Sequence, residues 1–345
     1  MPSIKDYDYY LPKELIAQSP AEPRDSSRLL VYHKPTGRIE HRIFRDILDY
    51  LRPGDVLVAN ESRVIKTRLT GRKGSGGRVS ITLVDVMDEK RHEYDVFVKG
   101  KNPKIGTLLY FPGGLVGEIV DKNETRFVIK FNKDPLPVIE RYGDYTLPGY
   151  IHNERYDRDR YQTVFANPVR SGSIAAPTAG LHFTQELLDK LREKGVIFTT
   201  TCLHVGIGTF QEVEVDDYTK HKMHSEWVEV DEETANIINN RKGRLFVVGT
   251  TSLRALETAT DESGMVRPYR GYTDLFIYPG YRFKLSLDGM ITNFHLPRST
   301  LLLLVSAIIG DDWKRVYRTA VEKRYRFFSF GDAMLILLNE NSHPQ

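Results

Sequence analysis

The stretch Leu245-Phe246-Val247-Val248-Gly249-Thr250-Thr251-Ser252-Leu253-Arg254 decides the fold class of this chain. Four consecutive apolar residues are typical of a buried strand, the next four form a polar turn, and a helix pattern begins near Leu253. A strand that passes through a polar turn into a helix is the repeating unit of α/β domains. In such domains, the loops at the carboxyl ends of the strands form the ligand site.

Further helices and strands alternate on both sides of this stretch. Thr184 and Asp231 stand where helix patterns begin and are expected to cap them, and Gly195 is expected to end the first of these helices. This alternation predicts an α/β domain whose sheet is barrel-like or an open parallel sheet. The predicted helices cover residues 43–51, 185–194, 232–238, 301–309 and 311–325, and the predicted strands cover residues 56–59, 196–203 and 245–248.

Residues 64–148 follow a different pattern. Short alternating runs are separated by turn-forming glycine and proline, which is typical of small antiparallel barrels or sandwiches. We therefore expect a small antiparallel β-barrel domain inserted into a discontinuous α/β catalytic domain made of residues 1–63 and 149–345. The alternating runs include residues 79–86, 94–98 and 126–131.

Composition excludes several classes of protein. The chain has 345 residues, 40% of them hydrophobic and 28% charged, as in an ordinary globular protein. Residues 1–7 lack the layout of a signal peptide, and the apolar run 301–309 is too short to span a bilayer. The single cysteine, Cys202, excludes an intrachain disulfide and lies in a β-branched run that predicts a buried, unreactive thiol. We expect a cytoplasmic protein with no membrane partner.

The excess of positive charge lies in the predicted β domain. Residues 64–148 carry 15 Lys and Arg against 11 Asp and Glu, whereas the rest of the chain carries 34 against 35. Basic faces with aromatic residues can hold phosphates and stack unpaired bases, although basic residues are also common on any soluble surface. The candidate nucleic-acid contacts are Arg63, Lys66, Arg68, Arg72, Lys73 and Arg78, with Arg324 and Arg326 in an aromatic C-terminal segment.

Three familiar kinds of site fit the sequence poorly. Gly206-Ile207-Gly208 lacks the third glycine of a dinucleotide motif, and residues 249–253 do not match the G-x-S-x-G motif of hydrolases. His221 and His224 have an H-x-x-H spacing without the H-E-x-x-H motif, so we expect no metal. The hydroxyls of residues 250–252 either cap the following helix or stand at a helix N-terminus that faces an anion.

Several long motifs carry a resemblance to one family. They are residues 6–12, 15–18 and 24–29, the run Ala176-Pro177-Thr178-Ala179-Gly180-Leu181-His182-Phe183-Thr184, and the run Phe328-Ser329-Phe330-Gly331-Asp332-Ala333-Met334. Across nearly the whole chain these motifs resemble the S-adenosylmethionine:tRNA ribosyltransferase-isomerases of queuosine biosynthesis. Residues 59–64 depart from the Asn-Asn/Asp-Thr-Arg-Val type of sequence expected there, and residues 64–148 resemble the family only loosely.

The resemblance implies a reaction and its partners. The ribosyl group of S-adenosylmethionine would be transferred and isomerised onto 7-aminomethyl-7-deazaguanine at the wobble position of tRNA. The products would be epoxyqueuosine-containing tRNA, adenine and methionine. S-adenosylmethionine would be a substrate and no cofactor would be bound permanently. We expect a monomer or a weak homo-oligomer.

Candidate roles follow from this reaction. His182, His204 and His295 could remove the proton beside the sulfonium or protonate departing adenine, because the pKa of histidine lies near the working pH. Arg254 could clamp the methionine carboxylate. Tyr278 and Phe294 could lie over adenine or the sulfonium, and Asp274 or Asp332 could hold the ammonium. The other expected substrate contacts are Thr178, Gly180, Gly206, Gly208, Thr209, Gly249, Thr250, Thr251, Ser252 and Asn293.

Two alternatives remain open at this point. A non-catalytic RNA-binding protein would also carry the basic β domain, but it would have no need to bind S-adenosylmethionine. A simple S-adenosylmethionine-dependent RNA methyltransferase would release S-adenosylhomocysteine instead of adenine and methionine.

Overall fold

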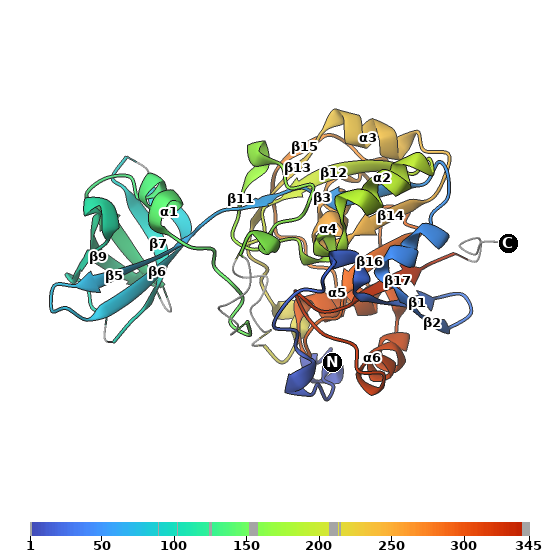
Figure 1. Cartoon of the computed structure of the whole chain (residues 1–345), viewed down its shortest axis with the longest axis horizontal. Coiled ribbons are helices and arrows are strands. Elements are labelled where there is room, and N and C mark those ends of the chain that lie inside the picture. The colour runs from blue at the N-terminus through green and yellow to red at the C-terminus, as the bar shows by residue number, and fades with distance from the viewer. Residues whose placement is uncertain are drawn as a thin grey trace. The chain divides into compact units, whose positions relative to one another are not determined.

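The computed structural model describes residues 2–88, 90–101, 103–123, 126–151, 158–206, 213 and 215–339. The chain divides into two compact units, which are residues 1–63 with 149–345 and residues 64–148 (Figure 1). The larger unit contains an open sheet and its covering helices, and the smaller unit is a closed barrel. None of the helices in the described ranges is long and apolar enough to cross a membrane.

A nine-stranded mixed sheet forms the centre of the larger unit, in the order β15-β13-β12-β3-β14-β16-β17-β1-β2. Only β12, β3, β14 and β16 form a continuous parallel block, because β17 runs antiparallel to β16 and β13 runs antiparallel to β12. The sheet is therefore open but mixed. The strands are β1 (Arg28–His33), β2 (Arg38–Ile43), β3 (Val56–Asn60), β12 (Ile197–Leu203), β13 (Glu226–Val230), β14 (Leu245–Val248), β15 (Tyr269–Thr273), β16 (Gly289–Asn293) and β17 (Ala333–Leu337).

Both faces of this sheet are buried, and successive residues of each central strand pack into different cores. Val56 and Val58 of β3 belong to one apolar cluster, whereas Leu57 and Ala59 belong to the other. This explains why the central strands read as continuous apolar runs in the sequence. The first cluster includes side chains from the helices over residues 232–239, 249–259, 300–309 and 312–322, and the second includes those of the helix over residues 185–193.

Short polar side chains start several of the covering helices. The Leu187 amide donates to Thr184 Oγ1 at 3.1 Å, and the Thr234 amide donates to Asp231 Oδ1 at 2.8 Å, which confirms both predicted caps. Gly195 follows the first of these helices with a φ of +91°. The α-helices of this unit are α2 (Gln185–Glu193), α3 (Glu232–Asn239), α4 (Gly249–Ala259), α5 (Thr300–Ile309) and α6 (Asp312–Glu322).

The predicted helix over residues 43–51 is a six-residue 3-10 helix, η4 (Phe44–Asp49). β2 ends at Ile43 and the Asp46 side chain accepts the Ile43 amide at 3.1 Å, so the segment is tightened into a turn rather than extended into an α-helix. Among the described residues, the other 3-10 helices of the larger unit are η1 (Ile4–Tyr7), η2 (Lys13–Leu15), η3 (Arg24–Ser26), η6 (Arg158–Tyr161), η7 (Pro168–Arg170), η8 (Thr178–His182) and η10 (Tyr218–Lys220). Two short strands, β4 (Arg63–Val64) and β11 (Ser171–Ser173), complete the list.

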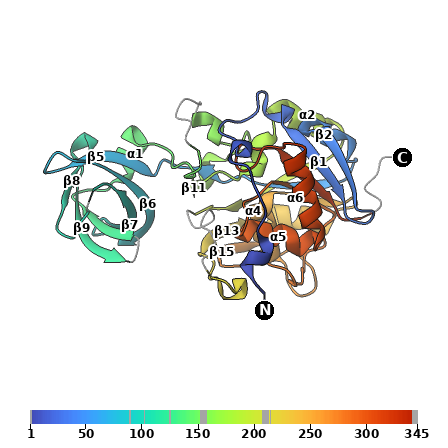
Figure 2. The same cartoon turned by 90° about the horizontal axis from the view of Figure 1, so that it is seen from below.

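The smaller unit is a closed antiparallel barrel in the order β10-β7-β6-β5-β8-β9, and Figure 2 shows these strands curving into a ring. Its interior is filled by apolar side chains such as Val79, Ile81 and Ile119. Gly71 is needed where β8 approaches, since a Cβ there would lie 2.4 Å from the Tyr110 carbonyl oxygen. The elements are β5 (Arg68–Lys73), β6 (Arg78–Asp88), β7 (Glu93–Lys99), β8 (Leu108–Tyr110), β9 (Val116–Asn123) and β10 (Arg126–Phe131), with η5 (Pro112–Gly114) and α1 (Leu136–Tyr142).

Cys202 lies in β12 with 2% of its surface exposed, which confirms the prediction that it is buried. Burial raises the pKa of its thiol to about 12. The thiolate, which is the nucleophilic form, is therefore scarce at neutral pH, as expected for a structural cysteine.

Candidate active site

Loops from distant parts of the chain meet at one edge of the nine-stranded sheet. β12, β14 and β16 belong to the parallel block, so Val205, Gly249 and His295, which follow these strands, lie at the same edge. β17 runs antiparallel to β16 and pairs Ala333 with Asn293, so the residues before β17 arrive at this edge too. The mixed topology therefore brings a C-terminal loop into a site that parallel strands alone would not include.

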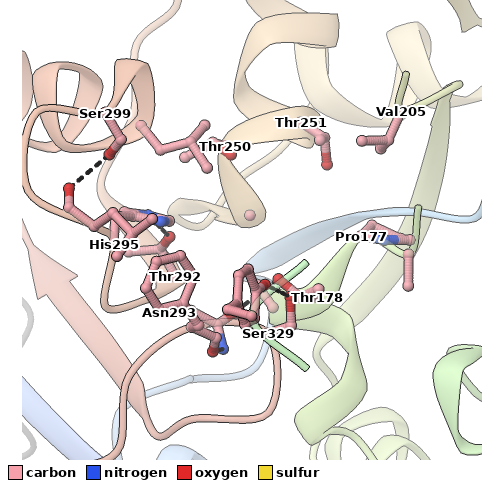
Figure 3. A pocket seen from close by; sticks show the side chains of 17 residues that line it. Pro177, Thr178, Val205, Thr250, Thr251, Thr292, Asn293, His295, Ser299 and Ser329 are labelled. Carbon is pink, nitrogen blue, oxygen red and sulfur yellow. Dashed lines mark hydrogen bonds between the residues drawn. The ribbon is translucent and has the colours of Figure 1, made fainter. Parts of the chain in front are cut away.

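These loops line a pocket with about 770 Å³ of atom-free space, open solvent included (Figure 3). Its lining by described residues contains no Lys, Arg, Asp or Glu. A ligand in this pocket would therefore be held mainly by neutral hydrogen-bonding groups and by aromatic contact. The polar lining side chains are Tyr150, Thr178, Thr250, Thr251, Thr292, Asn293, His295, Ser299 and Ser329.

The amino end of α4 opens onto this pocket. Gly249 leads from β14 into α4 with a φ of +88°, a left-handed conformation that glycine adopts without strain. No side chain caps the helix, because its N-cap residue is Val248, which has no polar side-chain atom, and the Ser252 hydroxyl instead donates to the Val248 carbonyl at 2.6 Å. The alternative that these hydroxyls merely cap the helix is therefore wrong. The amide groups of the first turn have no partner within the helix.

His295 lies directly in the pocket, after the carboxyl end of β16. Its Nε2 is 2.9 Å from Thr292 Oγ1, its amide donates to the Tyr317 hydroxyl at 3.2 Å, and its carbonyl accepts from the Tyr9 hydroxyl. Only 8% of the residue is exposed, and burial lowers the pKa of the imidazole to about 3. The neutral form, which accepts a proton, is thus the form present at neutral pH.

An aromatic wall forms another side of the pocket. The rings of Tyr150 and Phe328 lie with their centroids 4.3 Å apart, and the Tyr150 hydroxyl shares a hydrogen bond with Ser329 Oγ. Phe328 has a φ of +73°, which is costly for a bulky residue. Its amide donates to the Phe294 carbonyl at 3.0 Å, and its own carbonyl accepts from Asn293 Nδ2 at 3.0 Å. The strained backbone at Phe328 therefore places an aromatic ring at the pocket.

His182 does not line the pocket but supports residues that do. Its Nδ1 is 2.7 Å from Ser27 Oγ, and Asn293 Nδ2 lies 3.2 Å from its Nε2. Because Asn293 Nδ2 is a donor, Nε2 is the acceptor and Nδ1 carries the proton. The Asn293 carboxamide is thereby oriented with its Oδ1 toward the Thr178 hydroxyl, which lies 3.4 Å away.

The two buried histidines predict an acid-sensitive fold. Burial, with the charges of Arg326 and Arg24 for His182, lowers the pKa of both His182 and His295 to about 3. Between pH 6.5 and 5 the unfolded chain binds a proton at each site and the folded chain does not, so stability falls as the pH falls. The expected loss is about 2 kcal/mol for each histidine over this range.

Urea unfolding at several pH values between 6.5 and 5 would measure this loss. In the variant His182→Asn the pH dependence should become shallower, because one of the two titrations is removed. A variant with the same pH dependence as the unchanged protein would show that His182 titrates normally in the folded state.

Arg254 is held in a buried ion pair rather than exposed to the pocket. Its Nη1 contacts Glu226 Oε2, its Nε donates to the Leu275 carbonyl at 2.9 Å, and the two charged side chains are 4% and 3% exposed. Glu226 Oε1 also accepts the Gly206 amide at 2.9 Å. In the described structure the pair joins α4 to β13 and to Gly206, which lies three residues after the end of β12.

The structure places the other expected substrate contacts as follows. His204 does not line the pocket, and its ring lies against Gly172, where a Cβ would come within 2.4 Å of Cε1. Phe294 is fully buried among the rings of Tyr317, Tyr325 and Phe327. Gly208 and Thr209 lie outside the described residues.

The two carboxylates proposed for the ammonium also lie away from the pocket lining. Asp332 accepts the amides of Arg28 and Arg326 and pairs with the Arg326 guanidinium at 3.1 Å, so it organises a turn. Asp274 is exposed. Tyr278 packs against Tyr218 and Phe276, and Gly180 is enclosed by Phe165 and Thr163. Of the expected set, the pocket brings together Thr178, Gly249, Thr250, Thr251, Asn293 and His295.

Several candidate tRNA contacts are already engaged by protein groups. Arg68 pairs with Asp144 at 2.8 Å, Lys66 donates to the Glu140 carbonyl at 2.7 Å, and Lys73 donates to the Lys101 carbonyl. Arg326 is paired with Asp332, and Arg324 lies 4.0 Å from Glu14. By contrast, Arg63, Arg72 and Arg78 are exposed and form no ion pair with a described residue.

Sequence reasoning did not select several lining residues. Tyr150 and Ser299 stood in no motif used for the site. Phe328 and Ser329 stood in a motif from which only Asp332 was chosen as a substrate contact. The sequence signal that could have pointed to this turn is Gly331. The structure explains why a glycine stands there, since a Cβ would lie 2.6 Å from the Arg326 carbonyl oxygen. Within the described ranges, no group of three His, Cys, Asp or Glu side chains could hold a metal ion.

Comparisons with known proteins agree with this architecture. A model of the family described as "Queuosine biosynthesis protein" matches residues 4–336. Proteins named S-adenosylmethionine:tRNA ribosyltransferase-isomerase from Symbiobacterium thermophilum and Clostridioides difficile are 54% and 50% identical to this chain. These alignments cover 97% and 96% of this chain and 99% of each relative.

A solved structure is similar as well. The crystal structure of S-adenosylmethionine tRNA ribosyltransferase from Thermotoga maritima aligns with a TM-score of 0.55 at 40% identity, covering 96% of this chain and all of that one. The family match over most of the chain and the identity with full-length relatives lead to one conclusion. This chain belongs to the queuosine biosynthesis protein family, whose curated relatives are S-adenosylmethionine:tRNA ribosyltransferase-isomerases.

Proposed function

We propose that this protein transfers and isomerises the ribosyl group of S-adenosylmethionine onto 7-aminomethyl-7-deazaguanine at the wobble position of tRNA. The products are epoxyqueuosine-containing tRNA, adenine and methionine. The observation that carries the proposal is that several relatives with this enzyme's name share 50–54% of their residues with this chain over nearly its full length. The pocket at the sheet edge is the candidate location for the reaction.

We propose this pocket as the site of S-adenosylmethionine. The sulfonium acidifies the hydrogens on the 5′-carbon, so the enzyme needs a neutral base near that carbon and a group that assists the departure of adenine. His295 is the histidine that lines the pocket, burial keeps its imidazole in the neutral form, and we propose it as the group that takes the proton from the acidified 5′-carbon. The Tyr150 and Phe328 rings can lie against adenine or the sulfonium, where cation–π attraction contributes about 0.5–2 kcal/mol.

We propose His182 as a positioning residue rather than as a proton carrier. It lies outside the pocket lining, and its Nε2 already accepts from Asn293 Nδ2 at 3.2 Å. A fixed Asn293 carboxamide presents one orientation of acceptor and donor to the substrate, which supports the reactive geometry without a proton transfer.

Product analysis tests the proposed function. Incubation with S-adenosylmethionine and tRNA that carries the aminomethyl base should release adenine and methionine in equal amounts. Release of S-adenosylhomocysteine instead would identify a methyltransferase. Failure to bind S-adenosylmethionine in calorimetry, together with retained RNA binding, would leave a non-catalytic RNA-binding protein.

We propose that the barrel contacts tRNA through one row of side chains. Arg72 of β5 pairs directly with Arg78 of β6 on one side and with Tyr110 of β8 on the other, so the three side chains share the outer face. Tyr110 is 45% exposed, and neither guanidinium has an acidic partner among the described residues. Two like charges directly opposite each other destabilise a sheet, and RNA phosphates would relieve that repulsion.

The double variant Arg72→Gln/Arg78→Gln is expected to lower the affinity for tRNA and to make that affinity less dependent on salt concentration. Loss of two phosphate contacts should reduce the slope of log K against log salt by about 1.4 to 1.8. Filter binding at several salt concentrations measures the slope. The control variant Lys122→Gln/Lys130→Gln removes the same charge from exposed positions on β9 and β10. Equal effects of the two variants would mean that only net charge matters.

A further inference from the structure

The amino end of α4 is an open set of hydrogen-bond donors. Thr184, Asp231 and Ser299 provide side-chain caps for α2, α3 and α5, whereas α4, with eleven residues, has Val248 at its N-cap position and no such cap. The amides of its first turn therefore have neither an intrahelical partner nor a capping oxygen. Such a terminus carries partial positive charge and favours an anion.

A second, independent feature of the same place indicates a ligand. Thr251 is 7% exposed, it lines the pocket, and its Oγ1 is buried with no hydrogen-bond partner among the described residues. Figure 3 shows this hydroxyl pointing into the pocket. Buried hydroxyls in native proteins are nearly always hydrogen-bonded, so an open one at a pocket wall indicates a missing acceptor.

We infer that the first turn of α4 and the Thr251 hydroxyl bind the carboxylate of the methionine end of S-adenosylmethionine. The inference rests on the proposed function. Arg254, the residue expected to clamp this carboxylate, is instead occupied by Glu226, and no Lys or Arg is among the described lining residues. Amide donors, a helix dipole and one hydroxyl are therefore the groups left to hold the anion.

The pocket has the polarity that such a ligand requires. Donors for an anion lie at the start of α4, and the paired rings of Tyr150 and Phe328 form an aromatic surface for adenine or the sulfonium. Both sets of groups line the same pocket. A phosphate of the bound tRNA nucleotide is the other anion that could occupy the start of α4, and the experiment below separates the two.

Isothermal calorimetry with two ligands and three proteins tests the inference. The ligands are S-adenosylmethionine and its decarboxylated analogue, which lacks only the carboxylate. The proteins are the unchanged chain, the variant Thr251→Val and the control Thr258→Val. Thr258 lies on the same helix outside the pocket lining, and its hydroxyl donates to the Arg254 carbonyl at 2.8 Å.

The unchanged protein is expected to bind S-adenosylmethionine at least ~10-fold more tightly than the decarboxylated analogue. Thr251→Val should lose about tenfold in affinity for S-adenosylmethionine and little for the analogue, whereas Thr258→Val should keep the preference. If Thr251→Val does not fold, Thr251→Ser, which keeps the hydroxyl, should retain the preference and Thr251→Ala should lose it.

Three results would overturn the inference. The first is equal binding of both ligands by the unchanged protein, which leaves the proposed function intact. The second is a Thr251→Val variant that loses affinity for both ligands by the same factor and so keeps the preference, or that loses affinity for tRNA alone, as a phosphate subsite predicts. The third is no binding of either ligand, which defeats the proposed function together with this subsite.

Discussion

Replacement of His295 by alanine is expected to lower the rate of adenine release by at least ~100-fold. The residue lines the pocket, burial keeps its imidazole neutral, and Thr292 Oγ1 lies 2.9 Å from its Nε2. Removing the proton-accepting group should lower kcat more than the affinity for S-adenosylmethionine, because the lost interaction belongs to the transition state. Single-turnover measurement of adenine, with calorimetry of substrate binding, separates the two effects.

Two other histidine variants are measured beside His295→Ala, one as a control and one to test the alternative base. His41→Ala serves as the matched control, because His41 lies on β2 and its Nδ1 contacts the Tyr325 hydroxyl rather than the pocket. His204→Ala decides between the assignment made from sequence and the one made from structure. A His204 effect as large as that of His295, or near-normal turnover by His295→Ala, would remove His295 from the role of base.

Replacement of Arg254 by methionine is expected to destabilise the fold by about 3–5 kcal/mol. The change removes the Arg254 guanidinium from the Glu226 carboxylate, which is 3% exposed. Most of the cost is the burial of a carboxylate whose charge Arg254 no longer offsets, rather than the lost attraction itself. Urea unfolding at pH 7 measures the change in the free energy of unfolding.

A double variant separates these two contributions. In Arg254→Met/Glu226→Gln the buried charge is gone and a glutamine oxygen can still accept the Gly206 amide, so the double variant should be more stable than Arg254→Met alone. Lys190→Met, which breaks the exposed pair with Glu186 on α2, should leave the free energy of unfolding nearly unchanged. Equal destabilisation by the single and double Arg254 variants would contradict the explanation by the buried Glu226 charge.

The sequence predicted much of the local structure because local structure depends on near neighbours. Thr184 and Asp231 cap their helices as expected, since a cap needs only a short oxygen-bearing side chain and an amide three residues later. The alternating runs of residues 64–148 form strands of a closed barrel for a similar reason, since period-two apolarity places every second side chain inside. The family resemblance, which depends on long runs of identical residues, is also confirmed.

The candidate site was harder to predict. Histidine, amide and hydroxyl side chains at strand ends were the right kinds of residue, since the pocket includes His295, Asn293 and Thr251, whereas the arginine was not. Sequence could not show that Arg254 is occupied by Glu226, which is 28 positions away in the chain. Nor could it show that Tyr150 meets Ser329, 179 positions away.

For this protein, then, the sequence by itself determined the α/β class, the inserted barrel, the helix caps and the family. Only the tertiary structure decided which polar groups share a pocket and which are already neutralised. The reason is physical: a side chain's propensities and periodicity act over a few residues, whereas burial, pKa and charge pairing depend on partners that folding brings from elsewhere in the chain. His182 and His295 look alike in sequence, yet one supports Asn293 behind the pocket and the other lines it.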